Sequence, residues 1–141
     1  MHSEDMQKTN KITVYLRISG FSCDPSAITE ILGIQPDKVW RKGDLLMHTE
    51  KFKHKDNGWE IKSVSSDTIY LESHITDILK TALPVRDKFK NLPVGSSVML
   101  TCGVSFSPDS AIPSIFLDTE TLRFLGEINA DIDVDLYCVE D

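Results

Sequence analysis

Apolar and polar residues alternate along several segments of the chain, and this period of two predicts β-strands with one buried face. The alternation is clearest at residues 130–139, where Ile132, Val134 and Leu136 interleave with three aspartates. The other segments with this pattern are residues 12–18, 59–64 and 98–106, and shorter strands are expected at 45–47 and 114–117. The pair Asn57-Gly58 predicts a turn just before the strand at 59–64.

Three further segments have the spacing of amphipathic helices. In residues 24–33, Asp24 is placed to accept the free amide hydrogens of a first turn, and Gly33 can end the helix in a left-handed conformation. The other two helices are expected at 71–83, capped by Asp67 or Thr68, and at 119–128, capped by Asp118 and with Leu122, Leu125 and Ile128 on the inner face.

The elements therefore follow the order strand, helix, strand, helix, strand, helix, strand. Strands with one polar face indicate a sheet that is covered on one side only. We predict an α+β fold, a two-layer sandwich with a mixed or antiparallel sheet and about three helices packed on one face. The length of 141 residues favours a single domain, expected at residues 11–141, and the polar residues 1–10 are expected to form a disordered N-terminal arm.

Charge narrows the class of partner. Lys and Arg number 15 against 22 Asp and Glu, so the formal net charge is −7. A chain of this charge is unsuited to neutralising phosphates, which argues against a nucleic-acid partner and favours a basic protein. No segment resembles a secretion signal or a membrane span, so we expect a cytoplasmic protein with no membrane partner.

No pattern in the chain supports catalysis or a cofactor. Cys23, Cys102 and Cys138 are too widely spaced for a metal pair, and the four histidines show no zinc spacing. His74 is expected at the surface or rim of its helix. Glycine-rich phosphate loops are absent from the sequence. We therefore predict no catalytic residue, no metal and no cofactor, and a non-enzymatic role is favoured over an enzymatic one.

Basic residues gather in the segment 38–55, where six Lys or Arg stand against two acids. At its start Trp40 lies beside Arg41 and Lys42, with Asp44 close by. One interpretation is a site for an anion or an acidic partner, with Trp40 as an aromatic anchor and Arg41 as a bidentate donor. The other is a solvated loop whose tryptophan packs back onto the sheet.

Acidic residues gather at the opposite end, where residues 118–141 contain eight Asp or Glu and a single Arg. Strand geometry places Asp131, Asp133 and Asp135 on one face, about 7 Å apart. Such a row can bind a hard cation, dock a basic protein surface or protect an edge strand from pairing. A calcium loop of the EF-hand type is disfavoured because Leu136 stands where that loop needs glycine.

Five blocks of the sequence match a known family in the same order. They are YLRISG, ITEILGIQPDKVWRKGD, NGWEIKSV, LESHITDILKTALP and LDTETLRFLGEINADIDVDLY. On these blocks, which run from about Ile12 to Tyr137, the chain resembles the bacterial DUF4279 family. The resemblance implies a small bacterial cytoplasmic domain with immunity or interaction proteins among its relatives. It carries over no catalytic residue, because the family is named for its lack of an assigned function.

Two functional hypotheses follow, and a third possibility is self-association of the chain through an exposed strand edge, such as the one expected at residues 114–117. The first is a non-enzymatic protein-binding module, of the immunity type, that uses its charged surfaces. The second is a small-molecule, anion-binding or enzymatic domain in which Trp40, Arg41 and Lys42 hold an anion and Asp44 or His48 carries a proton. A deep pocket that joins these side chains would favour the second hypothesis.

Overall fold

The computed structural model describes residues 11–46, 49–64, 70–109 and 114–139. These residues form a five-stranded sheet in the order β2-β3-β1-β4-β5. Neighbouring strands are antiparallel except β4 and β5, which are parallel. The predicted α+β fold with a mixed sheet is confirmed. The strands are β1 (Lys11–Ser19), β2 (Lys38–Trp40), β3 (Gly58–Lys62), β4 (Ser97–Phe106) and β5 (Ala130–Cys138).

Helices cover one face of this sheet. They are α2 (Ser26–Leu32), α3 (Leu71–Ala82), the 3-10 helix η1 (Leu83–Asn91) and α4 (Thr119–Glu127). The predicted helix ends are confirmed at two places: Gly33 ends α2 with a left-handed φ of 72°, and the Asp118 carboxylate accepts a hydrogen bond from the Thr121 amide at 2.8 Å. Asp67 and Thr68 lie outside the described residues.

The core lies between the sheet and the helices. Alternate residues of β1 and β4, such as Leu16 and Leu100, point into it and are fully or almost fully buried. Trp59 of β3 is also fully buried, and its indole N–H donates to the Thr29 hydroxyl on α2 at 3.0 Å. This bond ties the shortest of these helices to the sheet.

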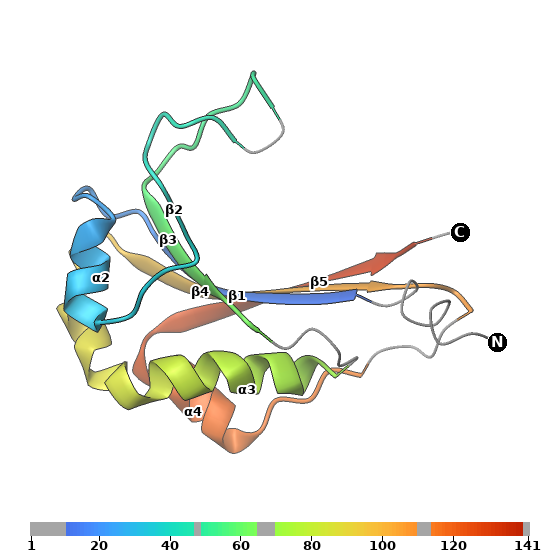
Figure 1. Ribbon diagram of the computed structural model, residues 1–141. Coiled ribbons are helices and arrows are strands. Elements are labelled where there is room, and N and C mark those ends of the chain that lie inside the picture. The colour runs from blue at the N-terminus through green and yellow to red at the C-terminus, as the bar shows by residue number, and fades with distance from the viewer. Residues whose placement is uncertain (1–10, 47–48, 65–69, 110–113, 140–141) are drawn as a thin grey trace.

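A long segment on the other side of the sheet, residues 41–57, connects β2 to β3, and we call it the arm. Figure 1 shows the arm projecting from the sheet on the side opposite α3 and α4. The strand predicted at 45–47 is wrong: Leu45 makes an isolated bridge to Lys53, and Met47 lies outside the described residues. The strand in this part of the chain is β2 instead. With three residues, it is too short to show an alternating pattern in the sequence.

Three other local predictions are corrected by the structure. Residues 114–117 form no strand, because they lead directly into α4 and β5 is the strand that pairs with β4. Asn57-Gly58 is not a turn, since Gly58 already belongs to β3. Leu122 is exposed, because the row of α4 residues that packs inward begins one position earlier, at Thr121. That row is Thr121, Phe124, Leu125 and Ile128.

His74 was expected at the surface or rim, and this prediction is wrong. Its side chain is buried, and its Nδ1 lies 2.6 Å from the Ser63 hydroxyl, which is also buried. The helical face of α3 that carries Leu71, Ile75 and Ile78 also carries His74, so the imidazole is drawn into the layer between α3 and the sheet. The pair joins α3 to the end of β3 through a polar contact.

Candidate functional site

The described helices leave one face of the sheet uncovered, and we call it the open face (Figure 1). Arg17 on β1, Glu60 on β3 and Met99 on β4 occupy one cross-strand row of this face. The same row continues to Lys38 on β2 and to Asp131 on β5. Both groups of residues singled out in the sequence therefore belong to this side of the molecule, the basic group at the β2 edge and the acidic group at the β5 edge.

Trp40 packs back onto the sheet. Its indole ring lies directly over Gly58 on the neighbouring strand, where a side chain of any size would collide with it. The other neighbour is His54 of the arm, which stacks on the indole with ring centroids 4.9 Å apart and an interplanar angle of 21°. With 8% of its surface exposed, Trp40 attaches the arm to the open face and has little area left for a partner.

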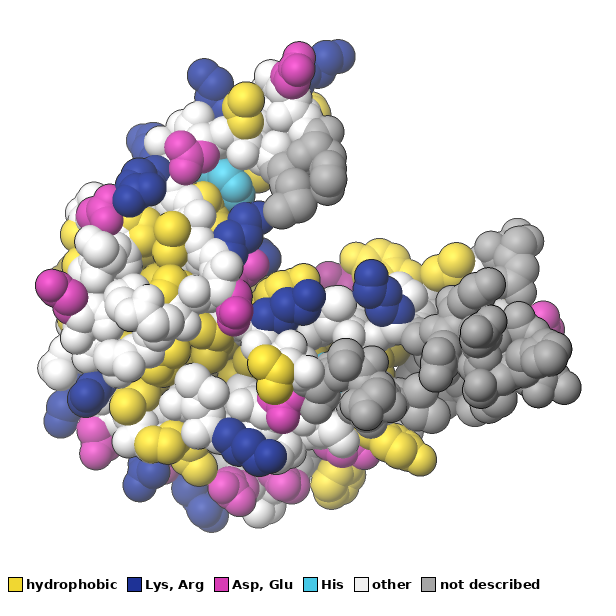
Figure 2. Space-filling model, in the orientation of Figure 1, with side chains coloured by type: hydrophobic (Ala, Val, Ile, Leu, Met, Phe, Trp, Pro, Cys, Tyr) yellow, Lys and Arg dark blue, Asp and Glu magenta, His cyan; other side chains and the backbone are white. Residues whose placement is uncertain are grey.

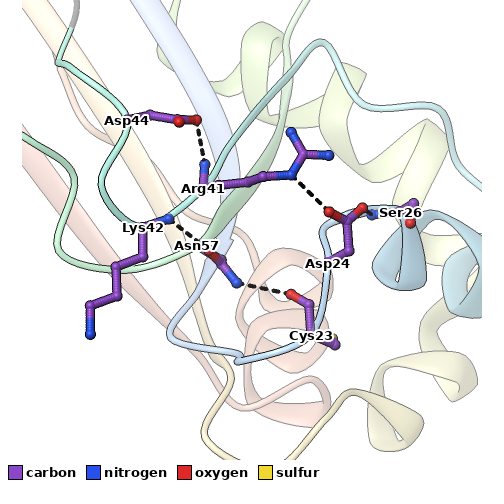
Figure 3. Close-up of polar contacts among 7 residues, drawn as sticks. All are labelled: Cys23, Asp24, Ser26, Arg41, Lys42, Asp44 and Asn57. Carbon is purple, nitrogen blue, oxygen red and sulfur yellow. Dashed lines mark hydrogen bonds and ion pairs between the residues drawn. The ribbon is translucent and has the colours of Figure 1, made fainter.

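Arg41 faces the loop before α2 and forms an ion pair there. Figure 3 shows its Nε donating to the Asp24 carboxylate, at 2.7 Å, while the same carboxylate accepts a hydrogen bond from the Ser26 amide. These hydrogen bonds hold the pKa of Asp24 well below its usual range, and the bond from Arg41 contributes the most. The pKa of Arg41 is raised in turn. The Asp24 carboxylate therefore accepts hydrogen bonds from both the arm and the start of α2.

The base of the arm is fixed by further polar contacts (Figure 3). The Arg41 amide donates to the Asp44 carboxylate at 2.8 Å, which closes a tight turn. The Lys42 amide donates to the Asn57 side-chain oxygen at 2.7 Å, and the Asn57 side-chain nitrogen donates to the Cys23 carbonyl at 2.9 Å. The Lys42 ammonium is left exposed. Arg41, Asp44 and the Lys42 backbone are thus engaged in holding the arm in place.

A charged cluster that the sequence did not reveal lies beneath the arm. The Arg17 Nε donates to the Glu60 carboxylate at 2.9 Å, and Glu60 is almost fully buried. The Arg17 guanidinium lies 5.3 Å from the centre of the Trp40 ring, and the Lys38 ammonium lies 5.6 Å from it. Burial lowers the pKa of His54, and the nearby charge of Lys38 lowers it further. Cation–π contacts and one ion pair therefore surround the tryptophan.

The acidic row on β5 has the geometry predicted from the sequence. Asp131 and Asp133 are exposed, and Asp135 is half-buried. They lie beside Met99, Thr101 and Gly103 of β4. None of the ion pairs among the described residues includes these three aspartates. The Thr101 hydroxyl, opposite Asp133, is buried and has no hydrogen-bond partner among the described residues.

A comparison with protein-family models gives a match to the domain of unknown function DUF4279 over residues 10–139. The match covers nearly the whole chain. The chain belongs to the DUF4279 family. Neither the curated proteins nor the solved structures gave a match to it. Membership therefore accounts for the five sequence blocks, and the roles of individual residues rest on their geometry.

Two pockets of this DUF4279 domain lie away from the residues singled out in the sequence. One, of about 140 Å³, lies between α3 and β3 and is lined by Ile61 and Asp77 among others. The other, of about 450 Å³, lies between η1 and α4 beside Arg86 and Arg123. Neither pocket includes Trp40, Arg41, Lys42 or Asp44, and His48 lies outside the described residues. The deep pocket that would favour catalysis at the basic segment is not one of these two.

The described part of the DUF4279 domain contains no group of three or more His, Cys, Asp or Glu side chains placed to hold a metal ion. Among its helices, none has the length and apolar character needed to cross a bilayer. Cys102 is buried, and its burial raises the pKa of the thiol to about 12. That thiol therefore stays protonated at neutral pH and is a poor nucleophile.

Proposed function

We propose that this domain is a protein-binding module whose β5 edge docks a basic segment of a partner protein. The observation that carries the proposal is the acidic row itself: three aspartates on one face of an edge strand, without an ion pair to any described side chain. By contrast, Arg41 is already paired with Asp24, and Trp40 is buried. The acidic edge is therefore the better-supported contact surface.

The position of β5 suggests how the partner is held. An edge strand presents backbone N–H and C=O groups that no neighbouring strand has paired, and an added strand can satisfy them. Side chains on one face of that added strand would lie opposite the acidic row. A partner segment with Lys or Arg at alternate positions would match the aspartates, which repeat every second residue along β5.

Overall charge supports the same type of partner. The formal net charge of −7 attracts a basic protein over long distances and repels nucleic acid. The specific role that fits these properties is of the immunity type, in which the acidic edge covers the phosphate-binding surface of a basic toxin nuclease. In that role the three aspartates take the place of phosphate groups.

The test uses a fluorescent seven-residue peptide in which lysine and threonine alternate. Fluorescence anisotropy would measure its affinity for the full chain and for two charge-reversal variants. In the first variant, Asp131, Asp133 and Asp135 are replaced by lysine. In the second variant, three exposed acids of the helical layer are replaced by lysine, so that the net charge changes by the same amount as in the first. These control positions are Glu30, Asp87 and Glu120.

We expect the β5 variant to bind the peptide at least about tenfold more weakly than the parent chain, which corresponds to about 1.4 kcal/mol. The helical-layer variant should lose little affinity. Equal losses in both variants would mean that the peptide responds to net charge alone, and would overturn the proposal. A peptide that binds neither the parent nor any variant would also overturn it.

A further inference from the structure

A hollow that does not involve β5 lies beneath the arm. Figure 2 shows a hollow between the arm and the open face of the sheet, with basic and acidic side chains and a histidine at its wall. The arm is held in shape by backbone hydrogen bonds from Gly43 to His54, from His54 to Asp44 and from Leu46 to Phe52, each shorter than 3 Å. These bonds hold the described part of the arm in place over the hollow.

Two cations and one carboxylate meet beside Trp40 at the floor of the hollow. Glu60 lies between Arg17 and Lys38 as the cross-strand neighbour of both. Its carboxylate pairs with the Arg17 Nε, and none of the ion pairs among the described residues includes Lys38. One buried carboxylate thus lies beside two cations, and the ammonium of Lys38 contacts the Trp40 ring instead of a carboxylate.

The free donors at this floor have the chemistry that binds oxyanions. A guanidinium has five N–H groups, and only the Nε of Arg17 donates in the hydrogen bonds of the described residues. The remaining N–H groups can bind two oxygens at once, and 40% of the Arg17 side chain is exposed. Lys38 supplies a second cation on the other side of Glu60. Partial burial under the arm strengthens such contacts relative to those at an open surface.

We propose that the hollow beneath the arm binds a small oxyanion, a carboxylate or a phosphate group, between the guanidinium of Arg17 and the ammonium of Lys38. The Trp40–His54 stack forms one wall and holds the arm over the bound group. This site differs from the one suggested by the sequence, because Arg41 is turned toward Asp24. It goes beyond the proposed function, since it uses neither β5 nor a protein partner.

Two variants with opposite expected effects test this site. Lys38→Gln removes a cation and leaves the Arg17–Glu60 pair intact. Glu60→Gln keeps a hydrogen-bond acceptor for Arg17 but removes the competing negative charge. Lys80→Gln, in an exposed position on α3, is the matched control, because it changes the net charge by as much as Lys38→Gln. The probes are inorganic phosphate and malonate, with chloride as the reference salt at constant ionic strength.

The indole N–H resonance of Trp40, identified with a Trp40→Phe variant, would report binding in NMR titrations. We expect a saturable shift with phosphate or malonate, and whichever anion saturates at the lower concentration identifies the favoured group. Lys38→Gln should weaken this binding at least about fivefold, and Glu60→Gln should tighten it about threefold or more. Lys80→Gln should leave it unchanged.

Three results would overturn the site. One is the lack of a saturable shift with either anion up to about 20 mM, which is weaker than a built site of two cations would give. Another is an equal loss of affinity in Lys38→Gln and Lys80→Gln. The third is weaker binding in Glu60→Gln, since a purely structural role of Glu60 predicts a loss where the proposed site predicts a gain.

Discussion

The contact between Trp40 and Gly58 allows a sharp test of how the arm is attached. A Cβ atom added to Gly58 would lie well inside van der Waals contact with the indole ring. To restore an ordinary carbon–carbon separation of about 3.5 Å, the ring would have to shift by roughly 1.5 Å. Such a shift would disturb the stacking of Trp40 on His54. The backbone of Gly58 does not itself require glycine, so Gly58→Ala isolates this contact.

The expected size of the effect follows from two opposing contributions. Overpacking of a buried contact costs about 1–3 kcal/mol. Replacing glycine by alanine within a strand stabilises by about 0.5–1 kcal/mol. In the parent chain Gly58→Ala should therefore lower the free energy of unfolding. In a Trp40→Ala background the overpacking is absent, and the same substitution should raise it. The difference between the two backgrounds should be about 1–3 kcal/mol.

Urea unfolding followed by circular dichroism would measure the four proteins of this cycle. Trp40→Ala itself costs about 3 kcal/mol or more, so all samples should contain the same stabilising osmolyte. Gly126→Ala in α4 is the control, because a Cβ there meets no atom within 4 Å. It should stabilise both backgrounds equally. An equal cost of Gly58→Ala with and without Trp40 would refute the reasoning.

Three further predictions concern single groups. Arg41→Gln should raise the pKa of Asp24 toward its usual value, measured by carboxyl NMR titration; the stabilisation from this pair is present above about pH 4 and is lost as pH falls through the lowered pKa. Ser63→Ala should lower the free energy of unfolding in urea by about 1–3 kcal/mol, because the buried His74 loses a hydrogen bond. Cys102, whose thiol has a pKa of about 12, should resist iodoacetamide at pH 8 in the folded chain while the exposed cysteine at the end of β5 reacts, as measured by mass spectrometry.

Each of these has a result that would contradict it. An Asp24 titration unchanged by Arg41→Gln would mean that the ion pair is not maintained in solution. Unfolding of Ser63→Ala within about 0.5 kcal/mol of the parent would mean that water or another group replaces the hydroxyl. Equal alkylation rates for the two cysteines would mean that the β4 thiol is not buried.

Some of these features are local, and the sequence was sufficient to predict them. The alternation of β5 placed its aspartates on one face because successive side chains of a strand point to opposite sides. Asp118 and Gly33 mark helix ends because a cap acts on amides or carbonyls only a few residues away. The α+β class follows from the order of such elements.

Other features depend on which strands become neighbours, and no local pattern contains that information. Arg17 and Glu60 are 43 residues apart in the sequence and meet only through the register of β1 and β3. Trp40 is buried because the facing residue on β3 happens to be glycine, and β2 is too short to be detected by its periodicity.

The sequence by itself thus determined four of the five strands, the three α-helices, the helix ends at Gly33 and Asp118, and the acidic row, since each results from interactions between residues close along the chain. The tertiary structure alone decided that the basic segment folds over the open face and that Lys38 and Arg17 flank Glu60 as its cross-strand neighbours. It also decided that His74 is buried. Those arrangements come from pairing and packing between distant segments, where the geometry of the whole sheet sets which side chains meet.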